Sequence, residues 1–180
     1  MNFLQTTRPL LICGIDPGAN TGIVILQKVG KYFLLKFNRT VKSSPKKPLV
    51  DRLGTLFRAI STITDVYRPE TILVEGMRHF PVARGSVKST VIQAQFHGAV
   101  LAALGNLRYE AKVVVVPPPR VQWAGRGRIR TAGQPTKKLA RILCRQYLGK
   151  QAEELTEHEA DAAALCLWLC LNANKKGEMK

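Results

Sequence analysis

Leu10-Leu11-Ile12-Cys13-Gly14-Ile15-Asp16-Pro17-Gly18 is the stretch of sequence that decides the fold. Its first six residues are apolar or small, as in a buried β-strand, and the strand ends at an acid followed by a Pro-Gly turn. A second apolar run, Thr71-Ile72-Leu73-Val74, also ends at an acid, Glu75. Two strands that each end in a carboxylate predict a polar site at one edge of a sheet.

A third acid, Asp161, lies in His158-Glu159-Ala160-Asp161 at the start of an apolar helical stretch. Acids are scarce in this chain, which has 12 acidic and 28 basic residues and a formal net charge of +16. Carboxylates at strand ends and on a helix face, in so basic a chain, predict a magnesium site that acts on a polyanion.

Length and composition predict a single globular domain over residues 1–180, because 180 residues with 46% hydrophobic content are enough for a core. The longest apolar run, Ala162 to Leu171, has ten residues, too few to cross a bilayer. The first strand begins near Pro9, which leaves no room for a signal peptide. We therefore expect a cytoplasmic or nucleoid location without membrane contact; the host is left open, a phage origin included. The four cysteines are expected to be buried free thiols.

Residue patterns predict a mixed arrangement of strands and helices. Strands are expected at Leu10–Asp16, Gly22–Gln27, Tyr32–Phe37, Thr71–Glu75 and Ala111–Val116. Helices are expected at Leu49–Tyr67, Ser86–Leu104, Pro135–Tyr147 and Glu157–Leu171. Three consecutive strands followed by alternating helices and strands describe an α/β fold, the RNase H-like mixed five-stranded sheet flanked by helices.

Two details of this plan concern single segments. The first three strands are expected to be joined by tight turns at Asn20-Thr21-Gly22 and Val29-Gly30-Lys31. Four consecutive valines make the fifth strand a candidate for a deeply buried position.

Four separated pieces, in this order, resemble the RuvC-like Holliday junction resolvases. They are Gly14-Ile15-Asp16-Pro17-Gly18 with Thr21-Gly22, Val74-Glu75, Gln93-Ala94-Gln95-Phe96-His97-Gly98, and His158-Glu159-Ala160-Asp161-Ala162. The resemblance implies a homodimeric, structure-selective endodeoxyribonuclease that resolves four-way DNA junctions by paired, metal-dependent phosphodiester hydrolysis. Two alternatives stay open: a broader RNase H-like nuclease on branched DNA or structured RNA, and a non-catalytic nucleic-acid-binding module.

The resemblance also implies a metal centre formed by Asp16, Glu75, His158 and Asp161. Hard Mg²⁺ prefers oxygen ligands, and in-line hydrolysis of a phosphodiester is typically served by two ions, so we expect two Mg²⁺, with Mn²⁺ able to substitute. His158 is expected to bind metal directly or to manage a proton. Glu157, one turn before Asp161, is a reserve ligand. Thr156 and Glu159 fit a capping box, which assigns Glu159 to structure.

Basic residues are concentrated in a segment at 120–145, because the interval between Glu110 and Glu153 holds ten Lys or Arg and no acid. We expect DNA contacts from this segment, from the stretch after Glu75 and from a basic loop at 42–48. The residues are Arg120, Arg126, Arg128, Arg130 and Arg141; Arg78, Phe80, Arg84 and Lys88; and Lys46 and Lys47. Arg78 occupies the position of the family's aromatic wedge, which Phe80 could replace. Either Lys137 or Lys138 resembles the family's catalytic lysine, and both remain open.

Overall fold

The computed structural model describes residues 10–77, 87–117 and 136–176. Its centre is a five-stranded sheet with the order β3-β2-β1-β4-β5. The strands are β1 (Leu10–Asp16), β2 (Asn20–Val29), β3 (Tyr32–Lys42), β4 (Thr71–Glu75) and β5 (Lys112–Val116). The helices are α1 (Leu49–Tyr67), α2 (Val87–Gly105), α4 (Thr136–Leu148), the short 3-10 helix η2 (Gly149–Glu154) and α5 (Glu157–Lys176).

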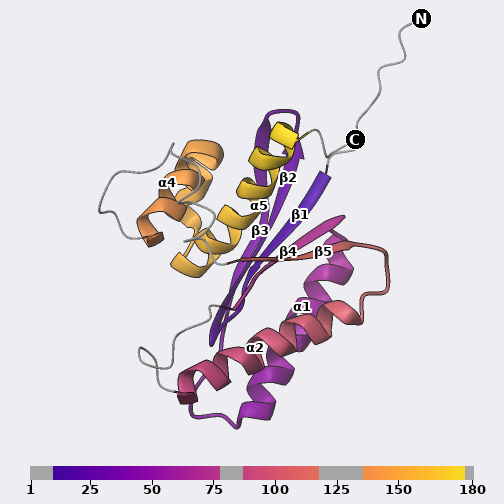
Figure 1. Cartoon of the computed structure of the whole chain (residues 1–180), viewed down its shortest axis with the longest axis vertical. Helices are drawn as coiled ribbons and strands as arrows, with labels where there is room; N and C mark the ends of the chain where they lie inside the picture. The colour runs from indigo at the N-terminus through magenta and orange to yellow at the C-terminus, as the bar shows by residue number, and fades with distance from the viewer. Residues whose placement is uncertain (1–9, 78–86, 118–135, 177–180) are drawn as a thin grey trace, which may run out of the picture.

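The sheet is mixed, as the sequence predicts. β2 runs antiparallel to its neighbours β1 and β3, whereas β4 and β5 run parallel to β1. Helices α1 and α2 lie on one face, and α4 and α5 cover the other (Figure 1). The RNase H-like arrangement is therefore confirmed, with β2, β3 and α5 longer than the sequence patterns predict.

Two buried cores follow from the alternation of side chains along each strand. On β1, Ile12 packs into the core with α4 and α5, whereas Cys13 and Ile15 pack into the core with α1 and α2. On β4, Leu73 belongs to the first core and Ile72 and Val74 to the second. Because of this alternation, the residue that ends each strand faces the side of the sheet opposite to that of the residue before it.

The first predicted turn is wrong. Asn20 begins β2, and Gly22 lies inside the strand, paired with Asp16. A Cβ added to Gly22 would overlap the backbone carbonyl of His158, so this glycine permits close packing of α5 on the sheet. The second turn is confirmed: Gly30, between β2 and β3, has a φ of 59°.

The prediction of a deeply buried fifth strand is also wrong. Val113 is 39% exposed and Val115 is 49% exposed, and only Val116 is fully buried. The reason is topological: within the described residues, β5 is an edge strand that pairs only with β4. An apolar run indicates a strand but does not say whether both of its faces are covered.

The remaining expectations about burial are confirmed. Cys13, Cys144, Cys166 and Cys170 are all buried and free. Burial raises the pKa of the Cys13 and Cys144 thiols to about 12, so they remain protonated. No helix of the described ranges is long and apolar enough to cross a membrane.

Candidate active site

Asp16 and Glu75 lie side by side because of strand register. Ile15 pairs with Val74 across the parallel strands β1 and β4, and the two acids are the next residues along. Since Ile15 and Val74 face the α1–α2 core, alternation turns both acids to the opposite face, which α5 covers. The sheet thus places two carboxylates together beneath the first turn of α5.

The first turns of α5 are held unusually close to the sheet. An added Cβ at Gly14 would overlap the backbone carbonyl of Ala162, and one at Gly22 would overlap that of His158. Both glycines therefore let the α5 backbone rest directly on β1 and β2. His158 and Asp161, three residues apart on α5, share the helix face turned to the strand-end acids.

A capping box fixes where α5 begins, as the sequence predicts. The Glu159 amide donates to Oγ1 of Thr156 at 3.3 Å, and the Thr156 amide donates to Oε2 of Glu159 at 3.0 Å. The buried Glu159 carboxylate also accepts hydrogen bonds from Nδ2 of Asn38 at 3.1 Å and Oγ1 of Thr40 at 2.8 Å. Burial alone would raise the pKa of Glu159, but these hydrogen bonds outweigh it and hold the pKa below the ordinary value. Glu159 therefore ties the helix to β3.

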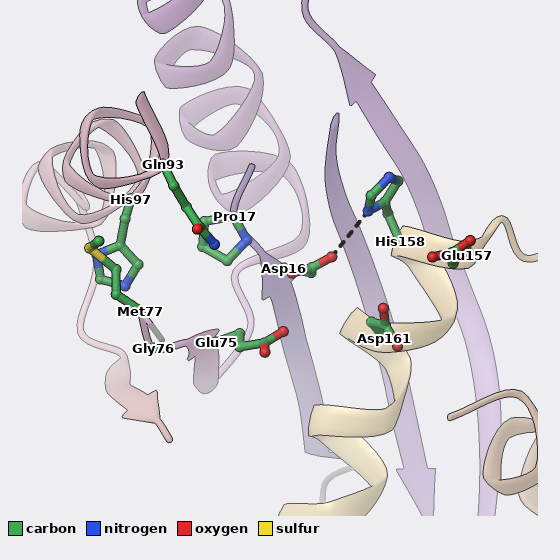
Figure 2. A pocket seen from close by; sticks show the side chains of 10 residues that line it. All are labelled: Asp16, Pro17, Glu75, Gly76, Met77, Gln93, His97, Glu157, His158 and Asp161. Atoms are coloured by element: carbon green, nitrogen blue, oxygen red, sulfur yellow. Dashed lines mark hydrogen bonds and ion pairs between the residues drawn. The ribbon is translucent and has the colours of Figure 1, made fainter. Parts of the chain in front are cut away.

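The four predicted metal-site residues line one open cavity of about 200 Å³ (Figure 2). Asp16 and Glu75 come from the strand ends, and Asp161 and His158 come from α5. Nδ1 of His158 lies 3.2 Å from Oδ2 of Asp16. This hydrogen bond raises the pKa of His158, against an opposite effect of burial, and the charges of Asp16, Glu157 and Asp161 add to the rise. Glu157 also lines the cavity.

The chemistry of these donors fits a hard divalent cation, since three carboxylates and an imidazole open onto the same space. These side chains are not arranged as a complete coordination shell. Within the described residues, no group of three or more His, Cys, Asp or Glu side chains is arranged to hold an ion. The Asp16 carboxylate pairs with Nδ1 of His158 at 3.2 Å.

Three further residues line the cavity from the opposite side and were not predicted as site residues: Met77, Gln93 and His97. Nε2 of His97 is buried and has no hydrogen-bond partner among the described residues. Burial lowers the pKa of His97, an effect that the Glu75 backbone carbonyl partly offsets. Gln93 and His97 are four residues apart on α2, so the sequence does carry a signal: both belong to the segment that resembles the family's helix.

The predicted DNA-binding residues are only partly described. Lys46, Lys47 and Arg141 are exposed, the first two in the loop before α1 and the third on α4. Lys88, Lys137 and Lys138 belong to the first turns of α2 and α4, and their side chains lie outside the described residues. So do the remaining predicted contacts: Arg78, Phe80, Arg84, Arg120, Arg126, Arg128 and Arg130.

Comparison with known proteins agrees with this geometry. The family "Crossover junction endodeoxyribonuclease RuvC" matches residues 12–169. A RuvC of Thermus thermophilus is 30% identical over 164 residues, which cover 88% of this chain and 92% of that protein. A RuvC of Neisseria meningitidis is 34% identical over 94 residues, 52% of this chain and 51% of that protein, so this match spans about half of its length.

The fold is also shared with a solved structure. The T. thermophilus RuvC in complex with a Holliday junction substrate superposes with a TM-score of 0.74 at 24% identity, over 93% of this chain and 97% of that one. The family match includes the strand-end acids Asp16 and Glu75 and the α5 residues His158 and Asp161. This chain belongs to the family of crossover junction endodeoxyribonucleases, RuvC.

Proposed function

We propose that this protein is a divalent-metal-dependent endodeoxyribonuclease that resolves four-way DNA junctions. One observation carries the proposal: Asp16 and Glu75, at the ends of neighbouring strands, open with His158 and Asp161 onto one cavity. The net charge of +16 supports a polyanionic substrate. Family membership supports four-way junctions within that class.

Each residue has a role that its position supports. The carboxylates of Asp16, Glu75 and Asp161 would supply oxygen ligands, with Asp16 central because it lies between Glu75 and His158 (Figure 2). Two Mg²⁺ ions, when bound, would activate a water for in-line attack and stabilise the leaving oxygen. His158 would supply a fourth ligand, or would hold a proton on Nδ1, the atom that faces Asp16.

We also propose that the protein acts as a homodimer through α2. Five exposed residues recur along this helix at alternating spacings of four and three: Val87, Val91, Ala94, Gly98 and Leu101. The opposite side of α2 is buried in the core through Phe96, Val100 and Leu104. The exposed seam has the heptad spacing of paired helices, and its small central residues allow close approach. A two-fold pair offers two matching cavities for paired cuts.

The experiment for the dimer is analytical ultracentrifugation of wild type beside Val91→Glu and Val66→Glu. Val66 is 70% exposed on α1 and serves as the matched control. We expect wild type and Val66→Glu to sediment as dimers and Val91→Glu as a monomer. A monomeric wild type, or a dimer that Val91→Glu does not weaken, would place the interface elsewhere.

The experiment for the activity compares substrates. Labelled mobile four-way junction, linear duplex, flap and structured RNA are each incubated with the protein, with and without Mg²⁺. We expect paired cuts in the junction only with Mg²⁺, and little cutting of the duplex. Equal cutting of flap or RNA would favour the broader nuclease, and binding without any cutting would favour a non-catalytic module.

A further inference from the structure

A second cavity lies beside the candidate active site, with a volume of about 100 Å³. We call it the Arg52 pocket. It is formed by the turn after β1, the end of β3, the basic loop, the first turns of α1 and one side chain of α2. The residues used below are Gly18, Lys42, Ser43, Lys47, Arg52 and Phe96.

The charged residues that line this pocket are all basic. Lys42, Lys47 and Arg52 line it, and no Asp or Glu does. Arg52 is only partly exposed, and among the described residues no carboxylate pairs with it. A half-buried guanidinium without a counter-ion is costly unless an anion reaches it. The pocket is therefore suited to a negatively charged ligand.

Arg52 is held in place by groups that leave most of its donors unused. Its Nε donates to Oγ of Ser43 at 2.8 Å, and its guanidinium lies over the Phe96 ring, 5.2 Å from the centroid. The Nη groups have no partner among the described residues. A guanidinium fixed in this way presents a fork of N–H donors, which matches the oxygens of a phosphate.

Hydroxyl groups complete the lining. Ser43, Ser44 and Thr55 contribute hydroxyls, and the Thr55 hydroxyl already donates to the backbone carbonyl of Asp51 at 2.8 Å.

The Arg52 pocket and the active-site cavity are immediate neighbours. Pro17 lines the active-site cavity and Gly18, the next residue, lines the Arg52 pocket. On α2, His97 lines the first and Phe96 lines the second. A strand with one phosphate at Asp16 therefore passes the Pro17–Gly18 turn to reach Arg52.

We propose that the Arg52 pocket holds a backbone phosphate of the strand being cut, other than the scissile one, and so sets where that strand lies across Asp16. This inference rests on the junction-cleaving function proposed above. It adds Arg52 as the central ligand of the subsite and gives Lys47 a defined place in it. Lys46, which does not line the pocket, has no part in it.

The test is a scan with charge-neutral phosphates. A single methylphosphonate is placed at each successive position on both sides of the cut in a four-way junction, and binding and single-turnover cleavage are measured with the full chain. For wild type we expect one non-scissile position at which the substitution weakens binding about tenfold or more, as for the loss of a charge-assisted contact.

The variants then assign that position to the pocket. Arg52→Gln should bind the unmodified junction about tenfold more weakly than wild type does. A methylphosphonate at the sensitive position should then lower the affinity of Arg52→Gln by less than about twofold, because the guanidinium that contacts this phosphate is already absent. Lys47→Gln should behave in the same direction. The matched control is Arg58→Gln, because Arg58 is exposed on the same helix and lies outside the pocket. This variant should show the same sensitive phosphate position as wild type, with the same loss of affinity.

Arg52→Gln also loses its contacts with Ser43 and Phe96, so thermal unfolding is measured for every variant. If Arg52→Gln does not fold, the exposed Lys47 decides the outcome through Lys47→Gln. A wild-type scan with no sensitive non-scissile position, or sensitivity that persists undiminished in the folded variants, would overturn the subsite. A wild-type protein that neither binds nor cuts the junction contradicts the proposed function itself and this inference with it.

Discussion

Nδ1 of His158 lies 3.2 Å from Oδ2 of Asp16, which joins the first turn of α5 to the end of β1. The two residues are 142 positions apart in sequence. Two glycines in the sheet, Gly14 and Gly22, allow this contact because they leave space for the α5 backbone. The candidate active site therefore depends on packing between elements as well as on its acids.

The first prediction concerns His158. If it supplies a ligand or moves a proton, His158→Ala should slow single-turnover junction cleavage by about 100-fold or more. His158→Asp should recover much of the activity, because an oxygen ligand suits Mg²⁺. A wild-type cleavage rate in His158→Ala would show that His158 is an ordinary side chain on the helix surface, without a role in the reaction.

The second prediction concerns the close approach of α5. Gly22→Ala should destabilise the protein by about 1–3 kcal/mol, because its Cβ meets rigid backbone, and should slow cleavage by displacing His158. Gly54→Ala is the matched control. Gly54 lies inside α1, where a Cβ has only ordinary contact, so a gain of about 0.5–1 kcal/mol is expected. Urea unfolding measures both; equal stability of Gly22→Ala and wild type would refute the packing argument.

The sequence predicts much of this arrangement and misses specific parts of it. The apolar runs that end at Asp16 and Glu75 are enough to predict that these acids meet at one edge of the sheet. The role of Gly22 could not be predicted, because an Asn-Thr-Gly sequence has local turn character and its contact with His158 is long-range. Likewise the edge position of β5 depends on strand order, which the valine run does not encode. Gln93 and His97 were missed as site residues because the resemblance of their segment does not say which of its side chains face the cavity.

The third prediction concerns Glu159 and pH. Its folded pKa lies below the ordinary value of 4.5, so its carboxylate stabilises the fold fully above that value. The contribution is lost as the pH falls through the folded pKa. Glu159→Gln should therefore cost about 1–3 kcal/mol at neutral pH, and the difference from wild type should shrink in acid.

The measurement for Glu159 is urea unfolding in EDTA at neutral pH and again in acid, below the ordinary pKa of a glutamate. Glu110→Gln is the control, because Glu110 is exposed and outside the capping box. A Glu159→Gln deficit that is the same at both pH values would show that the carboxylate charge contributes nothing.

The fourth prediction concerns the basic segment at 120–145. Replacing Arg126, Arg128 and Arg130 together by Gln should weaken binding to every DNA and flatten the slope of log affinity against log salt by about two to three units. Lys137→Ala or Lys138→Ala should instead lower the cleavage rate more than the affinity, as for a charge close to the scissile phosphate. A salt titration beside single-turnover cleavage separates the two effects. An unchanged slope in the triple variant would place the DNA on another face.

The most direct test of the carboxylate centre is single-turnover cleavage of a four-way junction by Asp16→Asn in Mg²⁺, measured beside its junction affinity. We expect cleavage to fall at least about 1,000-fold, since a metal ligand is lost. Binding should be retained or tightened, because a negative charge near phosphate is removed. Glu75→Gln and Asp161→Asn should behave alike, and Asp65→Asn, at an exposed position on α1, should cut as wild type does. Near-normal cleavage by Asp16→Asn would contradict the metal-dependent centre at the ends of β1 and β4.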